Sequence, residues 1–366
     1  MIYPTKKIKD IGTVVTGKTP LTARADYYDG QYMFVTPTEL HGSYKVTTSE
    51  KTITEAGLNS IKSNSISGES ILVGCIGWDM GNVAMCFEKC ATNQQINSIT
   101  KIKKECIPAY LYYWLKTKKD YLFSIASVTR TPILSKGVFE DIDVPLPDVE
   151  TQRNVANVLQ KLDEKIELNE GINDNLQQMA YDTFMHSFFR KESNGKLGDI
   201  IVENAKSPIQ VGDAKAANNG DIPFFTSGDA VLKWPEALVT GRNCYLNTGG
   251  NADVKFYVGD AAYSTDTWCI TASGEMSDYL YLLLLSIKPE LNQKYFQGTG
   301  LKHLQKPMLK DRPIYIPATK ELDTFNKTVQ PWFDMIASNV KESQSLVALR
   351  DWLLPMLMNG QAVVED

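Results

Sequence analysis

The second half of this chain repeats a pattern found in the first half. Three pairs of segments match at an offset of 169 or 170 positions: 110–116 with 279–285, 131–136 with 301–306, and 141–147 with 311–317. Asp10-Ile11 matches Asp199-Ile200 at the larger offset of 189, so the first copy carries about twenty more residues. The period is far longer than the roughly 20–50 residues of solenoid repeats. We therefore expect the 366 residues to form two related domains and not a repeat array.

Each copy is followed by a segment with the spacing of a long helix. Apolar or amide side chains recur there every three or four residues, as in a coiled-coil seam. The first seam consists of Val155, Leu159, Leu162, Ile166, Asn169, Asn173, Leu176 and Ala180, and the second of Leu322, Phe325, Val329, Trp332, Ile336, Asn339, Ser343 and Leu346. Pro331 lies inside the second segment, where it predicts a kink or the start of the helix.

The two helices have two possible partners. Each could pack on its own domain, or the two could pair with each other as an antiparallel coiled coil. The matched seams favour the pairing, in which Asn169 and Asn339 would be polar seam residues that set the register.

Charge is distributed unevenly along the chain. The net charge is −5 overall, with +3 in residues 1–147, −4 in 148–193, −1 in 194–317 and −3 in 318–366. The acidity therefore belongs to the helical segments, and the rest is near neutral or basic. A role in DNA binding is compatible with this distribution despite the acidic total.

Composition favours a cytoplasmic protein without membrane contact. No uncharged apolar run approaches the ~20 residues that span a bilayer, and the first residues contain no apolar core of a signal peptide. The six cysteines are scattered, which is typical of a protein in a reducing compartment.

Catalytic and metal-binding patterns are not evident. The three histidines have no cysteine or carboxylate at ligand spacing, and Cys86 and Cys90 are followed by no second pair that would complete a zinc site. Asp163-Glu164-Lys165 is nuclease-like in composition, but its position predicts a solvated helix face. We expect no catalytic residue, no metal site and no cofactor in this chain.

The remaining sequence has a mixed, β-rich α/β pattern. Short strands are predicted at 11–15, 32–35, 70–73 and 83–87, and helices at 109–118 and 278–287. The connecting loops are rich in Gly, Thr, Ser, Asn and Pro. The predicted fold is two α/β domains separated by two long helices, with pseudo-twofold duplication.

Polar loops are the candidate functional features. Residues 129–131 and 299–303 are equivalent in the duplication, and both place a cation and hydroxyl groups before a short helix. Residues 93–97 hold four amides, which can bind adenine edges or simply form a polar hairpin. The candidate DNA-binding residues are Lys18, Thr19, Arg24, Thr36, Thr38, Lys45, Asn93, Gln94, Gln95, Thr129, Arg130, Thr131, Lys136, Lys206, Thr226, Ser227, Arg242, Thr299, Lys302, His303 and Lys306.

Several motifs together resemble one family. Residues 145–147 (PLP), 152–153 (QR) and 159–176 resemble the central conserved region of specificity (S) subunits of type I restriction–modification systems. Residues 353–361 (LLPMLMNGQ) are similar to the C-terminal conserved region of that family, and residues 11–20 to the entry of its first recognition domain. The second copy departs from the pattern at 319–323 (TKELD), where the Gln-Arg pair of the first copy is missing.

This resemblance implies a non-catalytic DNA-recognition subunit. It implies two target recognition domains, 1–147 and 194–317, each reading one half of a bipartite double-stranded target. Spacer helices within 148–193 and 318–366 would set the spacing and dock two methyltransferase (M) subunits. The M partners would carry S-adenosylmethionine, and restriction (R) partners would use ATP and Mg²⁺. Two alternatives remain open, namely a stand-alone methyltransferase or nuclease, and a coiled-coil scaffold with protein- or glycan-binding heads.

Overall fold

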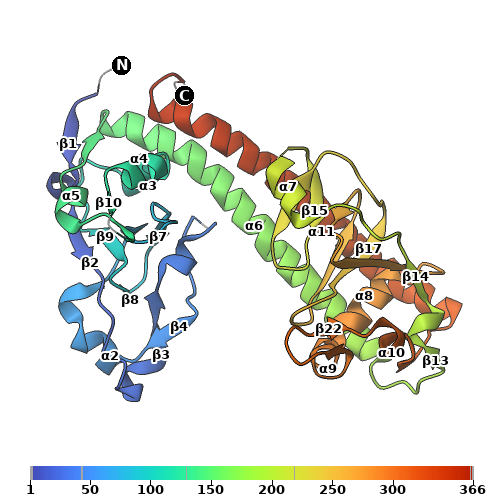
Figure 1. The fold of residues 1–366 in the computed structure, drawn as a ribbon. Coiled ribbons are helices and arrows are strands. Elements are labelled where there is room, and N and C mark those ends of the chain that lie inside the picture. Colours follow the sequence, from blue (N-terminus) through green and yellow to red (C-terminus); the bar gives the residue numbers. More distant parts are fainter. Residues whose placement is uncertain (1–2, 43, 129, 218, 363, 365–366) are drawn as a thin grey trace. The chain divides into compact units, whose positions relative to one another are not determined.

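A computed structural model describes residues 3–42, 44–128, 130–217, 219–362 and 364. The chain divides into two compact units (Figure 1). Unit 1 comprises residues 1–167 together with 343–366, and unit 2 comprises residues 168–342. Each of the two long helices, 149–188 and 319–358, therefore contributes residues to both units.

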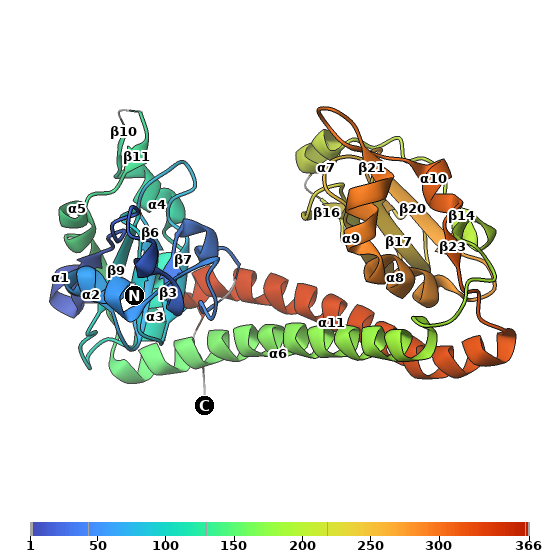
Figure 2. The same ribbon diagram turned by 90° about the horizontal axis from the view of Figure 1, so that it is seen from below.

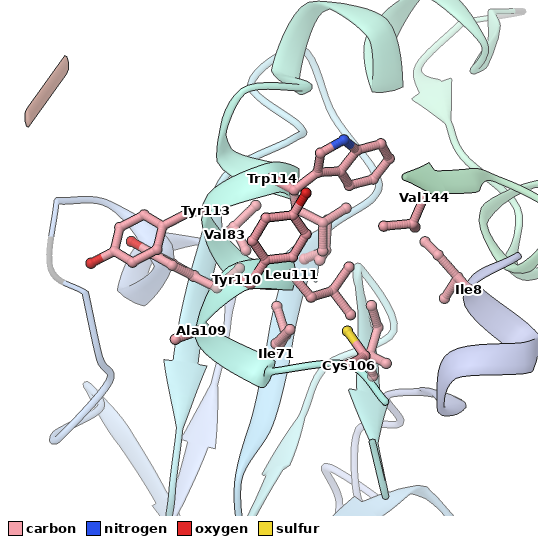
Figure 3. Close-up of a cluster of buried hydrophobic side chains, with 14 of the residues drawn as sticks. Ile8, Ile71, Val83, Cys106, Ala109, Tyr110, Leu111, Tyr113, Trp114 and Val144 are labelled. Carbon is pink, nitrogen blue, oxygen red and sulfur yellow. The ribbon is translucent and has the colours of Figure 1, made fainter. Parts of the chain in front are cut away.

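Unit 1 contains an antiparallel sheet of four strands in the order β2-β9-β6-β7. Its strands are β2 (Thr13–Thr16), β9 (Ile96–Thr100), β6 (Ser70–Gly74) and β7 (Val83–Cys86). Helix α3 (Pro108–Lys116) is apolar around its whole circumference, and all of Ala109–Leu115 is buried. Figure 3 shows Leu111 of this helix close to Ile71 and Val83 of the sheet. Burial of aromatic and aliphatic side chains on both sides of α3 accounts for the main core.

A second sheet in unit 1 has the order β4-β3-β8-β5. It consists of β4 (Lys51–Ile53), β3 (Tyr28–Val35), β8 (Cys90–Thr92) and β5 (Ser65–Ile66), with β3 and β8 parallel. Two small ladders pair β1 (Thr5–Lys7) with β12 (Asp143–Pro145) and β10 (Ser127–Val128) with β11 (Pro132–Ile133). The short helices are α1 (Ile8–Ile11), α2 (Glu55–Ser60), α4 (Lys119–Ser124) and α5 (Lys136–Glu140).

Unit 2 repeats this arrangement, which confirms the predicted duplication. Its antiparallel sheet has the order β14-β20-β17-β18, and its second sheet has the order β16-β15-β19 with β15 and β19 parallel. Their bounds are β14 (Ile201–Glu203), β15 (Ile222–Phe225), β16 (Val231–Trp234), β17 (Arg242–Asn247), β18 (Val254–Val258), β19 (Ala262–Tyr263) and β20 (Thr267–Ala272). The small ladders pair β13 (Gly195–Lys196) with β23 (Pro313–Ile314) and β21 (Phe296–Gln297) with β22 (His303–Leu304). The helices are α7 (Val211–Ala217), α8 (Ser277–Ser286), α9 (Lys288–Glu290) and α10 (Lys306–Lys310).

The additional residues of the first copy lie in one connection. Between β3 and β6 the chain runs through residues 36–69, which include β4, α2 and β5. The corresponding connection between β15 and β17, residues 226–241, contains only β16. The predicted strands and helices agree with β2, β3, β6, β7, α3 and α8, with bounds that differ by a few residues. The largest differences are at residue 11, which ends α1, and at the start of β3, which lies four residues before the prediction.

The long helices are α6 (Val149–Phe188) and α11 (Thr319–Met358) (Figure 2). In unit 2 the Asn169 side chain donates to Glu342 at 2.8 Å, and Asn339 donates to Asn173 at 2.9 Å. In unit 1 Arg350 bonds Asp163 at 2.6 Å. Rising numbers on α6 meet falling numbers on α11, so the predicted antiparallel pairing is confirmed. Asn169 and Asn339 both form hydrogen bonds across this pair, and their role in setting the register stays a prediction.

The helices also pack on the domains, which was the alternative expectation. Val155 and Leu159 of α6 join Leu354 and Leu357 of α11 in the core of unit 1. Phe184 and Phe188 of α6 join Leu322, Phe325 and Val329 of α11 in the core of unit 2. Of the other predicted seam residues, Ile166 is buried, and Leu162, Leu176, Ile336 and Leu346 are partly buried. Each helix therefore has an apolar face wide enough to contact both its partner helix and a domain.

Two local predictions about the helices were wrong. Helix α11 starts at Thr319 and continues through Pro331, so this proline does not mark its start. Asp163 is 3% exposed and does not lie on a solvated face. It accepts hydrogen bonds from Tyr113 at 2.6 Å and from Arg350 at 2.6 Å, two residues that are distant in sequence. The heptad spacing could not reveal this, because the partners come from α3 and α11.

Within the part of the chain that is described, no helix is long and apolar enough to cross a bilayer.

Candidate nucleic-acid interface

One edge of the main sheet in unit 1 gathers several of the predicted polar loops. Antiparallel pairing sets Thr16 opposite Asn97, Gly74 opposite Ile96, and Val73 opposite Val83. The ends of β2 and β6 and the starts of β9 and β7 therefore lie along the same edge. The loops 17–27, 75–82 and 93–95 all leave the sheet there, although they are far apart in sequence.

Hydrogen bonds tie these loops together. The Lys18 amide donates to the Thr92 carbonyl at 2.9 Å, and the Cys75 amide donates to Gln95 at 2.7 Å. The Thr19 hydroxyl donates to the Gln94 amide oxygen at 2.9 Å. At Gly17 a Cβ atom would come within 2.1 Å of the Asn93 carbonyl oxygen, so only glycine permits this approach. The loop arrangement is thus fixed by backbone contacts and leaves Lys18 and Gln94 exposed.

The hairpin β10–β11 docks on the same group of loops. Ile76 forms a bridge with Ile133, and the Gly77 amide donates to the Pro132 carbonyl at 3.0 Å. Arg130 and Thr131, in the turn of this hairpin, are exposed. Thr129, also predicted to contact DNA, lies outside the described residues. The sequence-predicted residues of the hairpin and the 93–95 turn are thereby brought to one edge.

Unit 2 builds the same assembly a second time. The hairpin β21–β22 bridges Gly249 through His303, and the Gly250 amide donates to the Lys302 carbonyl at 2.9 Å. The bridged loop, 248–253, leaves the corresponding edge of the sheet β14-β20-β17-β18. Thr299, Lys302 and His303 are exposed on this hairpin. The predicted correspondence with 299–303 therefore also holds in the structure for residues 130 and 131, the described part of 129–131.

Asn93 and Gln95 form hydrogen bonds with each other, which uses part of the hydrogen-bonding capacity of their side chains. The Asn93 side chain donates to the Gln95 side chain at 2.9 Å and accepts from the Gln95 backbone at 3.0 Å. This Asx-type turn is a structural role of Asn93. Gln94 is the exposed member of the turn, and its oxygen accepts from Thr19.

The predicted cations fall into two groups. Lys18, Arg130, Lys206 and Lys302 are exposed and have no ion-pair partner among the residues described. The other cations have acidic neighbours: Arg24 with Asp26 at 2.7 Å, Lys45 with Glu167 at 2.6 Å, Lys136 with Glu140 at 3.5 Å, and Lys306 with Glu203 at 4.0 Å. Lys306 also lies over the Trp268 ring, and burial lowers the pKa of its ammonium group. The first group offers its full charge to a phosphate, whereas the second is partly neutralised.

Arg242 lies among acidic groups of unit 2. Its guanidinium bonds both carboxylate oxygens of Asp278, at 2.8 and 2.9 Å, and also pairs with Asp334. Asp278 has no exposed surface, and burial raises the pKa of its carboxyl to about 6, while the charge of Arg242 opposes this shift. Arg242 therefore links β17 to α8 and α11.

The remaining predicted residues are hydroxyl groups with varied surroundings. Thr36 caps a turn by hydrogen bonding Glu39 at 2.7 Å. Thr226 is buried and donates to backbone carbonyls at 228 and 230. Thr38 is exposed and Ser227 is partly exposed. Among the residues described, no group of three His, Cys, Asp or Glu side chains could hold a metal ion.

The comparisons with known proteins agree with this architecture. Residues 3–178 and 191–338 match the family model described as type I restriction modification DNA specificity domain. The chain is 26% identical to the MjaIX specificity subunit of Methanocaldococcus jannaschii, over all of this chain and 94% of that one. It is 30% identical to the HindI specificity subunit of Haemophilus influenzae, over 43% of this chain and 35% of that one. The crystal structure of the type I S subunit from M. genitalium shares the fold, with a TM-score of 0.62, 14% identity and coverage of 97% and 96%. The chain therefore belongs to the family of type I restriction–modification DNA specificity subunits.

Proposed function

We propose that each unit reads one half of a bipartite DNA target through its edge loops. The single observation that carries this proposal is the loop-and-hairpin assembly, which occurs once in each unit. Each hairpin carries an exposed cation that has no ion-pair partner among the described residues. Two copies of one reading surface suit a target with two separate halves. The first recognition domain would be residues 1–147 and the second residues 194–317.

The chemistry of these loops suits DNA. Lys18, Arg130, Lys206 and Lys302 would contact phosphates and fix the register, while the neighbouring amides and hydroxyls would read base edges. Arg24, Lys45, Lys136 and Lys306 are weaker candidates because carboxylates already lie beside them. Arg242, Thr36 and Thr226 are left out of the proposed surface because their side chains already make internal contacts.

The paired helices would provide the spacer and the docking surface for the rest of the complex. A specificity subunit is the non-catalytic member of a type I restriction–modification system, so the chemistry belongs to its partners. We expect two M subunits, with S-adenosylmethionine, to dock on the segments 148–193 and 318–366 and methylate adenine. R subunits would add ATP- and Mg²⁺-dependent cleavage. Because adenine is methylated outside the base stack, the M subunits would flip it. The assembly would work on DNA in the cytoplasm.

Modified-base sequencing of the source genome, with and without this gene, tests the proposal. Loss of a bipartite adenine-methylation motif on deletion is the expected result. If methylation is unchanged, the chain is reconstituted with its M subunit and DNA binding is titrated with salt. A complex that shows no salt-dependent DNA affinity would contradict the proposal and favour a scaffold role.

Removal of the hairpin cations gives a sharper test at the loops. We expect Arg130→Ala and Lys302→Ala each to weaken DNA binding by the M complex, and to reduce the slope of log affinity against log salt by about one. Lys104→Ala is the matched control, because this exposed lysine follows β9 at the opposite edge of the same sheet. An unchanged slope in both hairpin variants would show that these residues do not contact phosphate.

A further inference from the structure

The most exposed large apolar side chains are concentrated on the proposed reading loops. Among the residues described, four such side chains are more than 60% exposed: Leu21, Trp78, Leu301 and Trp352. The first three lie in the edge loops or on the hairpin, and only Trp352 lies elsewhere, on α11. Single exposed apolar residues are common on proteins. Their concentration among Lys, Thr, Asn and Gln side chains is what calls for an explanation.

The loop that carries Trp78 is closed by hydrogen bonds of the neighbouring residues. Its loop closes through the Gly81 amide, which donates to the Gly74 carbonyl at 2.8 Å. The neighbouring Asp79 is fixed by the Lys119 ammonium at 2.6 Å. Gly77, which precedes the indole, has a φ of 109°, a backbone conformation that other residues rarely adopt. The indole is 70% exposed, and its ring centroid lies 6.2 Å from that of Phe123. A rigid loop thus presents an aromatic ring that the core does not cover.

Leu301 occupies the turn of the hairpin in unit 2. It is 64% exposed and lies between Thr299 and Lys302, which carry the hydroxyl and the ammonium of the proposed surface. The turn is tight, since a Cβ atom at Gly298 would come within 2.4 Å of the Leu301 carbonyl oxygen. The second unit therefore also presents an apolar side chain among polar ones.

DNA offers one chemical group that such a side chain would recognise. The C5 methyl of thymine is the apolar group that a base pair displays in the major groove, and amides and cations gain little from it. We infer that Trp78 and Leu301 are specificity-determining residues, each contacting a thymine methyl in the half-site read by its own unit. The inference deepens the proposed function and rests on it.

The first experiment compares methylation motifs. The chain is expressed with its M partner as wild type, Trp78→Ala, Leu301→Ala and the control Phe87→Ala, and adenine methylation is mapped by sequencing. Phe87 is an exposed aromatic residue that follows β7 at the end of the sheet opposite the reading loops. We expect Trp78→Ala to accept a second base at one thymine-containing position of one half-site. Leu301→Ala should relax a position in the other half, and Phe87→Ala should leave the motif unchanged.

The second experiment removes the methyl from the DNA. At the relaxed position, deoxyuridine replaces thymine in a synthetic duplex, and binding by the M complex is measured. Wild type should bind this duplex about fourfold more weakly, which corresponds to the burial of one methyl group. Trp78→Ala should bind both duplexes equally, whereas Trp78→Phe, which keeps an apolar ring, should retain part of the discrimination.

The possible results distinguish a failure of the proposed function from a failure of the inference about thymine methyl groups. If wild type methylates no bipartite motif, the proposed function fails and this inference fails with it. If wild type has such a motif and both alanine variants share it unchanged, only the inference fails. Relaxation at positions without thymine, or equal wild-type binding to thymine and deoxyuridine, would also overturn it. A folding control is simple, because 70% exposure of Trp78 predicts an unchanged unfolding midpoint for its variants.

Discussion

A nearly buried pair of opposite charges, Arg350 and Asp163, connects the two long helices in unit 1. Arg350 and Asp163 are both nearly buried, and their side chains meet at 2.6 Å where α11, α6 and α3 pack together in unit 1. Such a pair is costly to break on one side, because the remaining charge stays buried without its partner. The Tyr113 hydroxyl also donates to Asp163, and burial together with this carboxylate raises the pKa of Tyr113.

We expect Arg350→Met to destabilise the protein by about 3 kcal/mol. The double variant D163N/R350M should recover a large part of this loss, because it removes both charges and keeps an acceptor for Tyr113. Urea unfolding of both variants tests the prediction. Lys196→Met is the control, because its pair with Asp311 is largely exposed and its loss should leave the unfolding midpoint unchanged. A double variant less stable than R350M would contradict this account.

The buried carboxyl of Asp278 predicts that the free energy of unfolding depends on pH. Burial raises the pKa of its carboxyl from an ordinary 3.8 to about 6, so the folded protein binds a proton before the unfolded chain does. Lowering the pH from 7.5 to 5 should therefore add about 1 kcal/mol to the free energy of unfolding, and raising the pH through 6 should remove it. Asp278→Asn has no such proton, so the difference between variant and wild type should change by that amount. Identical pH profiles of the two proteins would rule out this titration.

At the scale of secondary-structure elements, some features could be predicted from the sequence and others could not. The duplication, the strands β6 and β7, the buried helices α3 and α8 and the seam residues Asn169 and Asn339 were predictable, because each depends on local spacing or on repetition. The dual packing of the long helices was less accessible, since it requires knowing which face of α6 meets which domain. Pro331 does not mark the start of α11, as one of the two expectations had it. A proline inside a helix removes one backbone hydrogen bond, and the burial of Val329 and Phe333 stabilises the helix on both sides of this position.

The predicted site residues also fall into two groups, those that the repetition in the sequence identifies and those whose roles depend on internal contacts. Arg130 and Lys302 could be selected because they recur in both copies, and both are exposed on equivalent hairpins. Arg242 and Thr226 have side chains that could contact DNA, but both have internal partners. Arg242 pairs with Asp278, which is distant in sequence. Thr226 donates to a backbone carbonyl in the turn that follows it, a contact that composition does not reveal. Trp78 was missed because polar residues alone were considered as readers of DNA. Its flanking glycines, Gly77 and Gly81, were the available signal of a constrained, exposed turn.

At the scale of the whole molecule, the paired helices predict how target geometry can be changed. Residues 169 and 173 of α6 meet residues 342 and 339 of α11, which defines matched positions for shortening both helices together. Deleting 170–176 with 335–341 removes one heptad from each, about 10 Å of helix. We expect the methylation motif of this variant to have a gap shorter by about three base pairs, with both half-sites unchanged. An unaltered gap in the sequenced motif would remove the spacer role of the helices.

The division of the chain also has a consequence for the order of its synthesis. Unit 1 begins at the first residue but ends with residues 343–366, and Leu354, Leu357 and Met358 belong to its core. A ribosome must therefore release residues 343–358 before unit 1 can complete its apolar interior, although domains usually fold in N-terminal order. A nascent chain halted after residue 342 would expose the surface beneath these three side chains. A nonsense mutation that removes residues 343–358 would accordingly damage unit 1, although residues 1–167 of that unit are still made.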